Sequence, residues 1–357
     1  NEEIKNIMMV LGLQKGVKYT KESILKLRYG KVYIVTDQDY DGFHICSLAL
    51  NFFKTWFPEL LELNFVKTIK TPIVRVEVKG KKEPLFFYTL SDFDSWKETT
   101  KSKFEVFYKK GLGSLTKTES KLFFSDLVKS QFEFVNDKKG FENIDLAFSK
   151  KNIENRKTWL STYDKNITLD YTKSEATISD YIHKQLKHFS SYDNVRSIPN
   201  LCDGLKPSQR KVLYGCLKKK LTKPLKVSQL SGYISEQAEY HHGEASLQGT
   251  IVSMAQNFCG SNNINLLFPE DQFGSRFQNG KDASSPRYIH TRLSDITTIL
   301  FSEADSSLLN YTEGDEGDFI EPDFYIPIIP MILVNGTKGI GTGYSTTVPM
   351  YNPRDII

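Results

Sequence analysis

The chain has 357 residues, 39% of them hydrophobic and 25% charged, and a formal net charge of +4, which predicts two or three ordinary globular domains. No apolar run approaches the roughly 18 residues of a membrane span, so we expect no membrane partner, and we expect no signal peptide. The four cysteines (Cys46, Cys202, Cys216 and Cys259) are too widely spaced for a disulfide framework, which indicates a reducing intracellular compartment.

The first part of the chain predicts an α/β domain that ends near residue 160. Lys31–Thr36 is an apolar, β-branched run typical of a buried strand. An acidic cluster follows, and then apolar residues recur at helical spacing from Ile45 to Trp56. Because ligands of open α/β sheets bind at the carboxyl ends of strands, we expect a functional site directly after Thr36. Further strands are expected at 74–78, 86–89 and 104–108, and a glycine-containing turn at 111–114 leads into a helix beginning near Leu115.

The second part of the chain is predicted to be mainly helical. Residues 161–177 are predicted to be a linker, because residues 164–173 are polar. The pattern from 178 to 300 is mostly helical. Within this part we expect a basic amphipathic helix at 210–221, a helix at 246–258, loops or short strands at 269–286, a strand at 324–334 and a glycine-rich turn at 336–345.

Three aspartates at alternate positions, Asp37, Asp39 and Asp41, are the first candidate site. Carboxylate oxygens suit Mg²⁺ and Mn²⁺, and such sites leave room for substrate phosphate. An EF-hand loop would need a glutamate at its twelfth position, where this chain has Leu48. A solvated acidic turn remains the alternative.

The second candidate is Tyr288, which directly follows Arg287. A tyrosine phenol has an ordinary pKa of about 10, so it needs a base or a cation to act as a nucleophile. Arg287 can grip a phosphate, and His242 or its neighbour His241 can take the phenolic proton. The alternatives are a tyrosine used in packing and a zinc site at the two histidines, although no cysteine has finger-like spacing.

A basic stretch from Lys206 to Lys223 contains seven Lys or Arg residues and no acid. It predicts nucleic-acid binding, or alternatively a solvated helix face. The glycine-rich stretch Gly336–Gly343 matches neither common phosphate-loop pattern and predicts a turn that presents Ile340. Such a residue either wedges between DNA bases or belongs to the core. Metal, an arginine-flanked tyrosine and basic segments together favour phosphodiester chemistry with a tyrosine nucleophile.

Short motifs in a consistent order connect these features to a known family. They are Asn6–Met8 (NIM), Leu11–Gln14 (LGLQ), Leu27–Lys31 (LRYGK), Thr36–Ile45 (TDQDYDGFHI), Tyr108–Ser114 (YKKGLGS), Ile144–Lys151 (IDLAFSKK), Arg156-Lys157, Arg196–Asn200 (RSIPN), Asp203–Pro207 (DGLKP), Gln209–Gly215 (QRKVLYG), Tyr240–Glu244 (YHHGE), Gln256–Phe258 (QNF), Gly280–Asp282 (GKD), Arg287-Tyr288, Ile332–Gly336 (ILVNG) and Gly339–Gly343 (GIGTG). Through nearly its whole length the chain resembles the DNA cleavage-and-rejoining core of type IIA DNA topoisomerases, closest to the eukaryotic and viral branch.

The resemblance implies an α/β plus α+β multidomain fold. A TOPRIM domain would occupy residues 1–160, a linker 161–177, a winged-helix domain with the catalytic tyrosine 178–325, and the start of a tower domain 326–357. The family's metal-binding glutamate lies in an E-G-D-S-A motif, which is expected upstream of Asn1, so we expect the chain to be a fragment.

The resemblance also implies roles for individual residues. Asp37 and Asp39, with Asp41 completing the motif, would bind two Mg²⁺ ions, which Mn²⁺ or Ca²⁺ can replace in binding. Tyr288 would form a transient 5′-phosphotyrosyl link to DNA, and Arg287 would stabilise the transition state. The other implied site residues are Arg196, Lys206 and His242 at the scissile phosphate, Asp203 beside them, Arg156, Lys157, Arg210 and Lys211 on the DNA backbone, and Ile340 as the wedge.

Double-stranded DNA is the implied partner, bound by a homodimer whose active sites are shared between its two protomers. ATP would be used by a domain absent from this chain. The expected location is the nucleus for a cellular protein and the host cytoplasm or viral replication site for a viral one. A TOPRIM nuclease or primase and a non-catalytic DNA-binding protein are the alternatives, and a protein-linked DNA product distinguishes the topoisomerase from both.

Overall fold

The computed structural model describes residues 2–81, 83–109, 111–125, 130–314 and 317–357. They form two compact units, Asn1–Tyr192 and Asp193–Ile357, and the boundary lies within helix α10 (Lys187–Ser197). The predicted boundaries at residues 160 and 178 differ from this one. Leu169 and Tyr171 of the expected linker are buried in the first unit, and its last residues, Glu175–Thr177, form strand β7. Residues 326–357 belong to the second unit and form no unit of their own.

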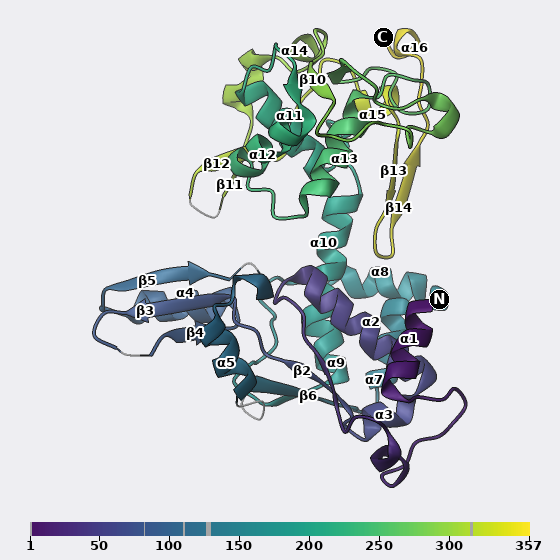
Figure 1. Ribbon diagram of the computed structural model, residues 1–357. Helices are drawn as coiled ribbons and strands as arrows, with labels where there is room; N and C mark the ends of the chain where they lie inside the picture. Colours follow the sequence, from purple (N-terminus) through teal and green to yellow (C-terminus); the bar gives the residue numbers. More distant parts are fainter. Residues whose placement is uncertain (1, 82, 110, 126–129, 315–316) are drawn as a thin grey trace. The chain divides into compact units, whose positions relative to one another are not determined.

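The first unit combines two sheets with several helices (Figure 1). Its elements are α1 (Glu2–Leu11), η1 (Ser23–Lys26), β1 (Val32–Ile34), α2 (Tyr40–Trp56), α3 (Pro58–Glu62), β2 (Val66–Ile69), β3 (Val74–Val78), β4 (Leu85–Phe87), α4 (Leu90–Thr99), β5 (Phe104–Tyr108), η2 (Leu112–Ser114), α5 (Lys117–Ser125), β6 (Gln131–Val135), α7 (Gly140–Phe148), η3 (Lys150–Asn152), α8 (Ile153–Ser161), β7 (Glu175–Thr177), α9 (Ile178–Tyr181), the π-helical segment η4 (Ile182–Leu186) and the first part of α10.

The main sheet of this unit has the strand order β1-β2-β6-β7. Strands β1 and β2 are parallel, β2 and β6 antiparallel, and β6 and β7 parallel. The predicted strand at 31–36 and the helix over 45–56 are confirmed as β1 and α2. Strands β2, β6 and β7 were not predicted; β2 and β7 are only four and three residues long, and β6 was not singled out although its sequence, QFEFV, alternates. Large aromatic and aliphatic side chains, among them Leu50, Phe57, Phe65 and Phe132, fill the core beside the sheet.

The strands predicted at 74–78, 86–89 and 104–108 are confirmed as β3, β4 and β5, the middle one shifted to Leu85–Phe87. They form a separate antiparallel sheet with the order β4-β3-β5 and a small core of their own around Val74, Val76 and Phe93. Figure 1 shows α4 beside this sheet. Within the described ranges, no helix is long and apolar enough to cross a membrane.

The second unit is built from short helices, a three-stranded sheet and two hairpins. Its elements are the end of α10, α11 (Pro207–Lys218), β8 (Leu225–Lys226), α12 (Val227–Gln237), α13 (Glu244–Ala255), β9 (Leu267–Pro269), η5 (Arg276–Gln278), β10 (His290–Leu293), α14 (Thr297–Leu300), η6 (Glu303–Leu308), β11 (Tyr311–Glu313), β12 (Phe319–Pro322), α15 (Met331–Val334), β13 (Thr337–Ile340), β14 (Ser345–Val348) and α16 (Pro353–Ile356).

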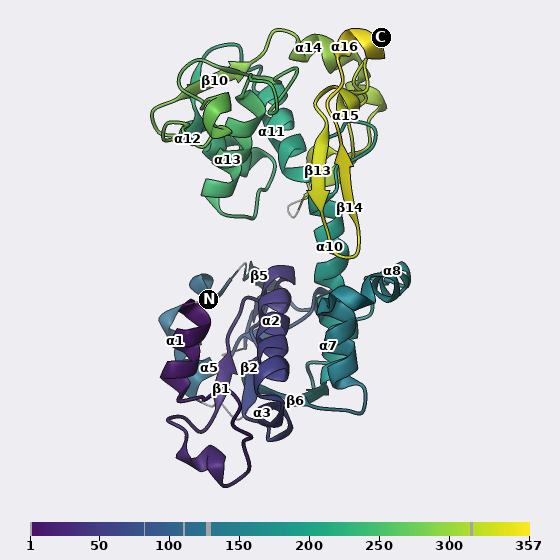
Figure 2. The same ribbon diagram turned by 90° about the vertical axis from the view of Figure 1, so that its right-hand side faces the viewer.

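Helices α11, α12 and α13 pack together around Leu213, Leu230 and Ile251, next to the antiparallel sheet β8-β10-β9. The helices predicted at 210–221 and 246–258 are thus confirmed as α11 and α13. The strand predicted over 324–334 is wrong. Pro327 and Pro330 have no N–H to give to a neighbouring strand, and the segment ends as the helical turn α15. The expected glycine-rich turn at 336–345 is part of a hairpin of β13 and β14, which Figure 2 shows most clearly.

Candidate functional site

The three aspartates of the acidic cluster occupy different local positions in the first unit. Asp37 lies beyond the carboxyl end of β1, and its Oδ1 accepts a hydrogen bond from the Leu112 N–H at 2.7 Å. Asp39 is the N-cap of α2, and its Oδ1 accepts from the Gly42 N–H at 2.7 Å. Asp41 lies in the first turn of that helix. In the part of the chain that the structure describes, no three His, Cys, Asp or Glu side chains are grouped closely enough to hold a metal ion. Asp39 Oδ1 is thus engaged at the start of α2, and the metal-binding role of the three aspartates stays a prediction.

Two glycines set the shape of this loop. A Cβ atom on Gly42 would stand 1.9 Å from the backbone oxygen of Asp37, far inside van der Waals contact. A Cβ atom on Gly111 would stand 3.1 Å from Asp37 Oδ2, tighter than ordinary contacts. The first glycine ends the D-x-D-x-D-G motif, and the second belongs to the distant YKKGLGS motif. The fold therefore joins two motifs that are 75 positions apart, through the Asp37 side chain.

Tyr40, which the sequence analysis did not single out, anchors the acidic loop. Its ring stacks on His188 with a centroid distance of 6.0 Å and contacts Tyr192 at 5.1 Å. The His188 ring is itself fixed, because Tyr163 Oη lies 3.0 Å from Nδ1 and the Ile167 carbonyl lies 2.9 Å from Nε2. Burial lowers the pKa of His188, and only its hydrogen bond to Ile167 and the more distant Asp164 oppose this. In the sequence, only the position of Tyr40 between two aspartates could have indicated this role. The rings that it contacts, His188 and Tyr192, lie about 150 positions away along the chain.

The second unit presents Tyr288 on a tight turn. The Tyr288 N–H donates to the Ser285 carbonyl at 2.9 Å, which closes a four-residue turn with Pro286 at its second position. Proline is favoured there because its fixed φ fits the turn. The Tyr288 side chain is 69% exposed, and Arg287 is also exposed. The turn therefore holds the phenol and the guanidinium at the surface.

Two hydrogen bonds join this turn to the start of α12. The Ser228 N–H donates to the Pro286 carbonyl at 3.1 Å, and the Val227 N–H donates to the Ile289 carbonyl at 3.0 Å. Ile289 is buried in the core of the unit. The position of Tyr288 thus follows from the packing of its neighbours on both sides.

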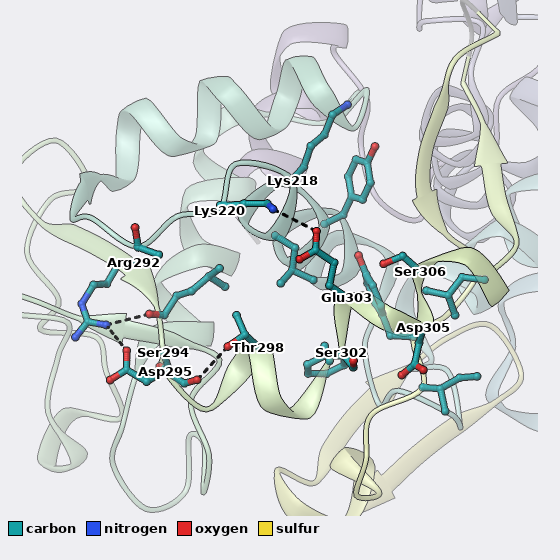
Figure 3. Close-up of a pocket in the computed structure, with 18 of the residues that line it drawn as sticks. Lys218, Lys220, Arg292, Ser294, Asp295, Thr298, Ser302, Glu303, Asp305 and Ser306 are labelled. Atoms are coloured by element: carbon teal, nitrogen blue, oxygen red, sulfur yellow. Dashed lines mark hydrogen bonds and ion pairs between the residues drawn. The ribbon is translucent and has the colours of Figure 1, made fainter.

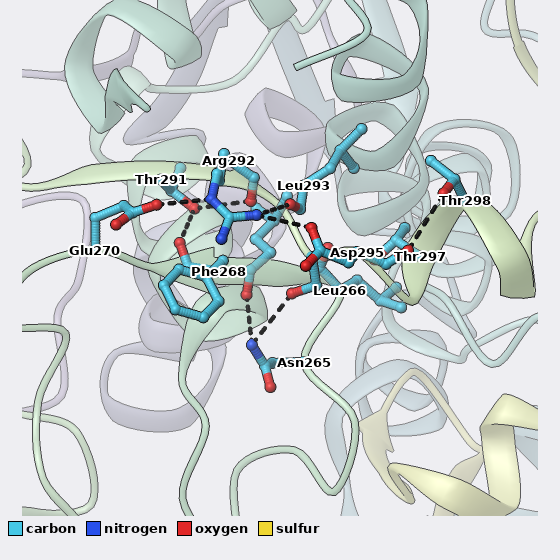
Figure 4. A network of polar contacts seen from close by, with 12 residues as sticks. Asn265, Leu266, Phe268, Glu270, Thr291, Arg292, Leu293, Asp295, Thr297 and Thr298 are labelled. Carbon is cyan, nitrogen blue, oxygen red and sulfur yellow. Dashed lines mark hydrogen bonds and ion pairs between the residues drawn. The ribbon is translucent and has the colours of Figure 1, made fainter. Parts of the chain in front are cut away.

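Further along β10, Arg292 is the centre of a polar network (Figure 4). Its guanidinium bonds to Glu270 at 2.7 Å and to Asp295 at 3.0 Å, and lies 4.4 Å from the ring centre of Phe268. The hydrogen bond to Glu270 is the main reason that the pKa of Arg292 is raised above its ordinary value. This network fastens β10 to β9.

The predicted residues Arg196, Lys206 and Ile340 are brought together by the hairpin. Lys206 Nζ donates to the Lys338 carbonyl at 2.9 Å, and Arg196 Nε lies 3.5 Å from Asp193 Oδ1. The other oxygen of Asp193 accepts a hydrogen bond from Thr342 Oγ1 at 3.0 Å, at the tip of the hairpin.

The glycines that flank Ile340 explain how close the hairpin lies to the end of α10. A Cβ atom on Gly339 would stand 2.3 Å from the Ser197 carbonyl oxygen, and one on Gly341 would stand 2.1 Å from Asn194 Oδ1. Ile340 itself is 69% exposed. Ile340 is therefore not a core residue, and its role as a wedge between DNA bases stays a prediction.

His242 stands just before α13. Its ring contacts Tyr240 edge-on, with a centroid distance of 5.4 Å. The Tyr240 hydroxyl donates to Ser246 Oγ at 3.2 Å, which ties this contact to the first turns of α13. His242 itself is exposed.

Two of the predicted DNA-backbone residues, Arg156 and Arg210, are buried and bonded within the protein. Arg210 is only 6% exposed and Asp203 is fully buried; Arg210 Nε and Nη2 bond to the two oxygens of Asp203 at 2.7 and 3.1 Å. Arg156 is also buried, and its guanidinium donates to the carbonyls of Leu146 and Ser149 at the end of α7. These hydrogen bonds give both arginines a structural role, and their expected contacts with the DNA backbone stay a prediction.

The remaining basic residues divide into tethered and exposed ones. Lys211 Nζ bonds to the Ala238 carbonyl at 2.5 Å and to Glu321 at 2.8 Å, so it is also a structural tether. Lys157 forms an ion pair with Glu154 at 2.8 Å on the surface of α8. Lys218, Lys219 and Lys220 at the end of α11 are exposed. The basic stretch is therefore not one uniform face.

A cavity of about 720 Å³ lies in the same unit, between the end of α11 and the segment from β10 to β11 (Figure 3). Its lining includes Lys220, which pairs with Glu303 at 3.3 Å, and the apolar side chains of Leu293 and Phe301. Lys218 and Lys220 of the basic stretch line it, but none of the residues predicted for cleavage or metal binding does. The cavity is thus a feature separate from the predicted chemistry.

Comparisons with known proteins agree with the division into units. Residues 69–194 match the family described as "C-terminal associated domain of TOPRIM". Residues 196–357 match the family of the DNA gyrase/topoisomerase IV A subunits. The two matches meet within a few residues of the boundary between Tyr192 and Asp193.

Relatives match along the whole chain. DNA topoisomerase 2 of Arabidopsis thaliana is 49% identical over 100% of this chain and 24% of its own length. That of Saccharomyces cerevisiae is 48% identical, again over 100% of this chain and 25% of its own length. The chain thus spans about a quarter of the length of these relatives. The chain also matches the crystal structure of the Plasmodium falciparum topoisomerase II DNA-binding, cleavage and re-ligation domain, with 48% sequence identity and a TM-score of 0.78. The match covers 100% of this chain and 49% of the Plasmodium chain.

Proposed function

Because this chain belongs to the type IIA DNA topoisomerases, we propose that it carries the DNA cleavage and rejoining chemistry of a type II enzyme, an isomerase that changes DNA topology. The observation that supports this most directly is the turn at residues 285–288. It holds a tyrosine that is 69% exposed next to an exposed arginine, and hydrogen bonds fix it to α12. A nucleophile that must reach a DNA backbone needs such access together with a fixed direction.

In the proposed step, the Tyr288 oxygen attacks a phosphodiester of double-stranded DNA. The bond from Tyr288 Oη to phosphorus forms, the bond from phosphorus to the 3′ oxygen breaks, the phenolic proton is lost, and the departing oxygen becomes a 3′ hydroxyl. The 5′ phosphate stays on the tyrosine. In this proposal Arg287 would balance the charge that develops on the phosphate oxygens, and His242 would accept the phenolic proton. One ester replaces another, so the reverse step rejoins the strand without ATP.

The acidic loop fits a divalent cation by its donor set. Asp37 and Asp39 offer hard carboxylate oxygens, and an oxygen that accepts one hydrogen bond keeps another lone pair. Gly42 and Gly111 keep side chains away from Asp37. We therefore assign Asp37 and Asp39 as Mg²⁺ ligands, with Asp41 beside them in α2, and Mn²⁺ or Ca²⁺ as substitutes. When bound, the cation would stabilise negative charge on the phosphate and the leaving 3′ oxygen.

The second unit supports a DNA-bending role. The helices α11–α13 with the sheet β8-β10-β9 are consistent with a winged-helix domain. We propose that the exposed Ile340 enters a base step as a wedge, with Arg196 and Lys206 at the backbone nearby. Homodimerisation, with active sites shared between the two protomers, and action in the nucleus complete the proposal and rest on the family alone.

The test is a cleavage-complex assay with the full-length protein. Supercoiled plasmid is incubated with Mg²⁺, the reaction is quenched with denaturant, and DNA linked to protein is measured. We expect Tyr288→Phe to abolish the linked product and to leave DNA binding intact. Tyr351→Phe is the matched control, because Tyr351 is also an exposed tyrosine of this unit, and it should retain the product. Linear DNA with free ends that persists in Tyr288→Phe would instead establish a metal-dependent nuclease.

A further inference from the structure

The segment that carries Tyr288 is held on a second side by a group that the mechanism above does not use. His290, the first residue of β10, lies two positions after the tyrosine. Its backbone N–H donates to Asp271 Oδ2 at 2.7 Å, and its ring Nδ1 lies 2.9 Å from the same oxygen. The Glu270 N–H also donates to the His290 carbonyl at 3.2 Å, and the Ser284 N–H donates to the Gln272 carbonyl at 3.0 Å. Residues 270–272 therefore line the tyrosine segment at both of its ends.

The pairing of His290 with Asp271 is specific in its geometry. A carboxylate only accepts hydrogen bonds, so the Nδ1 atom of His290 carries a proton and the ring orientation is fixed. The side-chain and backbone hydrogen bonds from His290 lower the pKa of Asp271. Both side chains are more than a third exposed, so the energy of the ion pair is screened by solvent. The pair therefore acts mainly by fixing the orientation of the backbone at His290, and its interaction energy contributes little to stability.

We propose that His290 and Asp271 are positioning residues for the Tyr288 nucleophile, an inference that rests on the proposed function. The exposed phenol has little packing of its own, so its direction depends on the backbone at residues 285–290. On one side, Ser228 and Val227 hold this backbone to α12. On the other side, Asp271 holds this backbone by accepting hydrogen bonds from the backbone N–H and the ring Nδ1 of His290. A displacement of about 1 Å at a reacting atom lowers a rate by up to about 10²-fold, so loss of this tether affects chemistry before it affects binding.

The neighbouring Arg292–Glu270 pair provides a matched control. Arg292 Nε donates to Glu270 Oε1 at 2.7 Å (Figure 4). This contact joins the same two segments as the pair of His290 and Asp271, but two positions further along the chain from Tyr288. The other charged groups near His290 are Lys226, which is its direct cross-strand neighbour on β8, Arg292, and Glu270. Lys226 and Arg292 have no acceptor, and the Glu270 carboxylate is bonded to Arg292, so none of them replaces the Asp271 carboxylate.

The experiment compares Asp271→Ala, His290→Leu, His290→Asn and Glu270→Ala in the full-length enzyme. The readouts are the rates of covalent complex formation and of rejoining after salt addition, with DNA affinity measured separately. We expect Asp271→Ala and His290→Leu to lower both rates about 10- to 100-fold with DNA affinity unchanged. His290→Asn should restore most of the rate, because its amide N–H stands close to the position of Nδ1. Glu270→Ala should keep the wild-type rates.

Wild-type rates in Asp271→Ala, or an equal loss in Glu270→Ala, would overturn the positioning role. Failure of the proposed function has a different signature, namely covalent product that persists in Tyr288→Phe. Circular dichroism of each variant shows whether the fold is retained. His290→Asn keeps the proposal testable even where His290→Leu does not fold.

Discussion

The buried ion pair between Asp203 and Arg210 allows a test that separates structure from DNA contact. Asp203 is fully buried and accepts four hydrogen bonds, two from the Arg210 guanidinium and one each from the N–H groups of Leu205, at 2.8 Å, and Tyr325, at 3.0 Å. The change Arg210→Met keeps much of the side-chain volume and removes the positive charge. It leaves a buried carboxylate without its counter-charge.

Breaking a buried pair from one side destabilises a protein by about 3–5 kcal/mol. The second unit has the size at which 1 kcal/mol shifts Tm by roughly 2–4 °C, so a drop of roughly 6–20 °C is expected for its unfolding. The double variant Asp203→Asn/Arg210→Met should recover part of this loss, because it removes the unpaired charge as well. Lys218→Met, on the exposed end of the same helix, should change Tm very little.

The assay follows the two units separately. Trp56, Trp96 and Trp159 are the three tryptophans of the chain, and all lie in the first unit. Tryptophan fluorescence therefore reports the first unit, whereas far-UV circular dichroism reports both. We expect Arg210→Met to lower the transition seen by circular dichroism and to leave the fluorescence transition unchanged.

DNA binding supplies the result that would refute this reasoning. Each lost phosphate contact reduces the slope of log K against log salt by about 0.9. For Arg210→Met we expect an unchanged slope, measured below the lowered Tm. A slope reduced by about one unit, together with wild-type stability, would show that Arg210 contacts DNA and is not a core residue.

Two further predictions concern the first unit. Gly42→Ala should abolish DNA cleavage, because its Cβ atom would stand 1.9 Å from the Asp37 backbone oxygen and displace the acidic loop. Gly30→Ala is the control, because a Cβ atom there meets no atom within 4 Å. Cleavage retained in Gly42→Ala would contradict the role of the loop. Lys67 donates a hydrogen bond to Glu133 and lowers its pKa, so this pair stabilises the unit above the ordinary glutamate pKa of about 4.3, and the contribution is lost as the pH falls through the lowered value. Glu133→Gln should therefore flatten the loss of stability in acid seen by tryptophan fluorescence, and an acid limb identical to that of the wild type would exclude this contribution.

The sequence by itself determined the elements whose signals are local. The apolar run before the aspartates predicted β1, helical patterns predicted α2, α11 and α13, and the strands β3, β4 and β5 were also predicted from local sequence. Chain order and short motifs identified the family. The glycines around Ile340 also predicted a turn that presents this side chain, because the conformational requirements of a turn depend on a few adjacent residues.

Only the tertiary structure decided which polar groups are free to act. Arg210 and Arg156 looked like surface cations, but they satisfy a buried carboxylate and the carbonyls at a helix end. Lys211 finds its partner Glu321 at a distance of 110 positions along the chain. Asp39 caps a helix, and Tyr40 stacks on a histidine that follows it by about 150 positions. Burial and pairing depend on which distant segments meet in the fold, and residue type and spacing do not report this. A charged side chain has the same neighbours in the sequence whether its counter-charge is a phosphate of DNA or a carboxylate of the protein core.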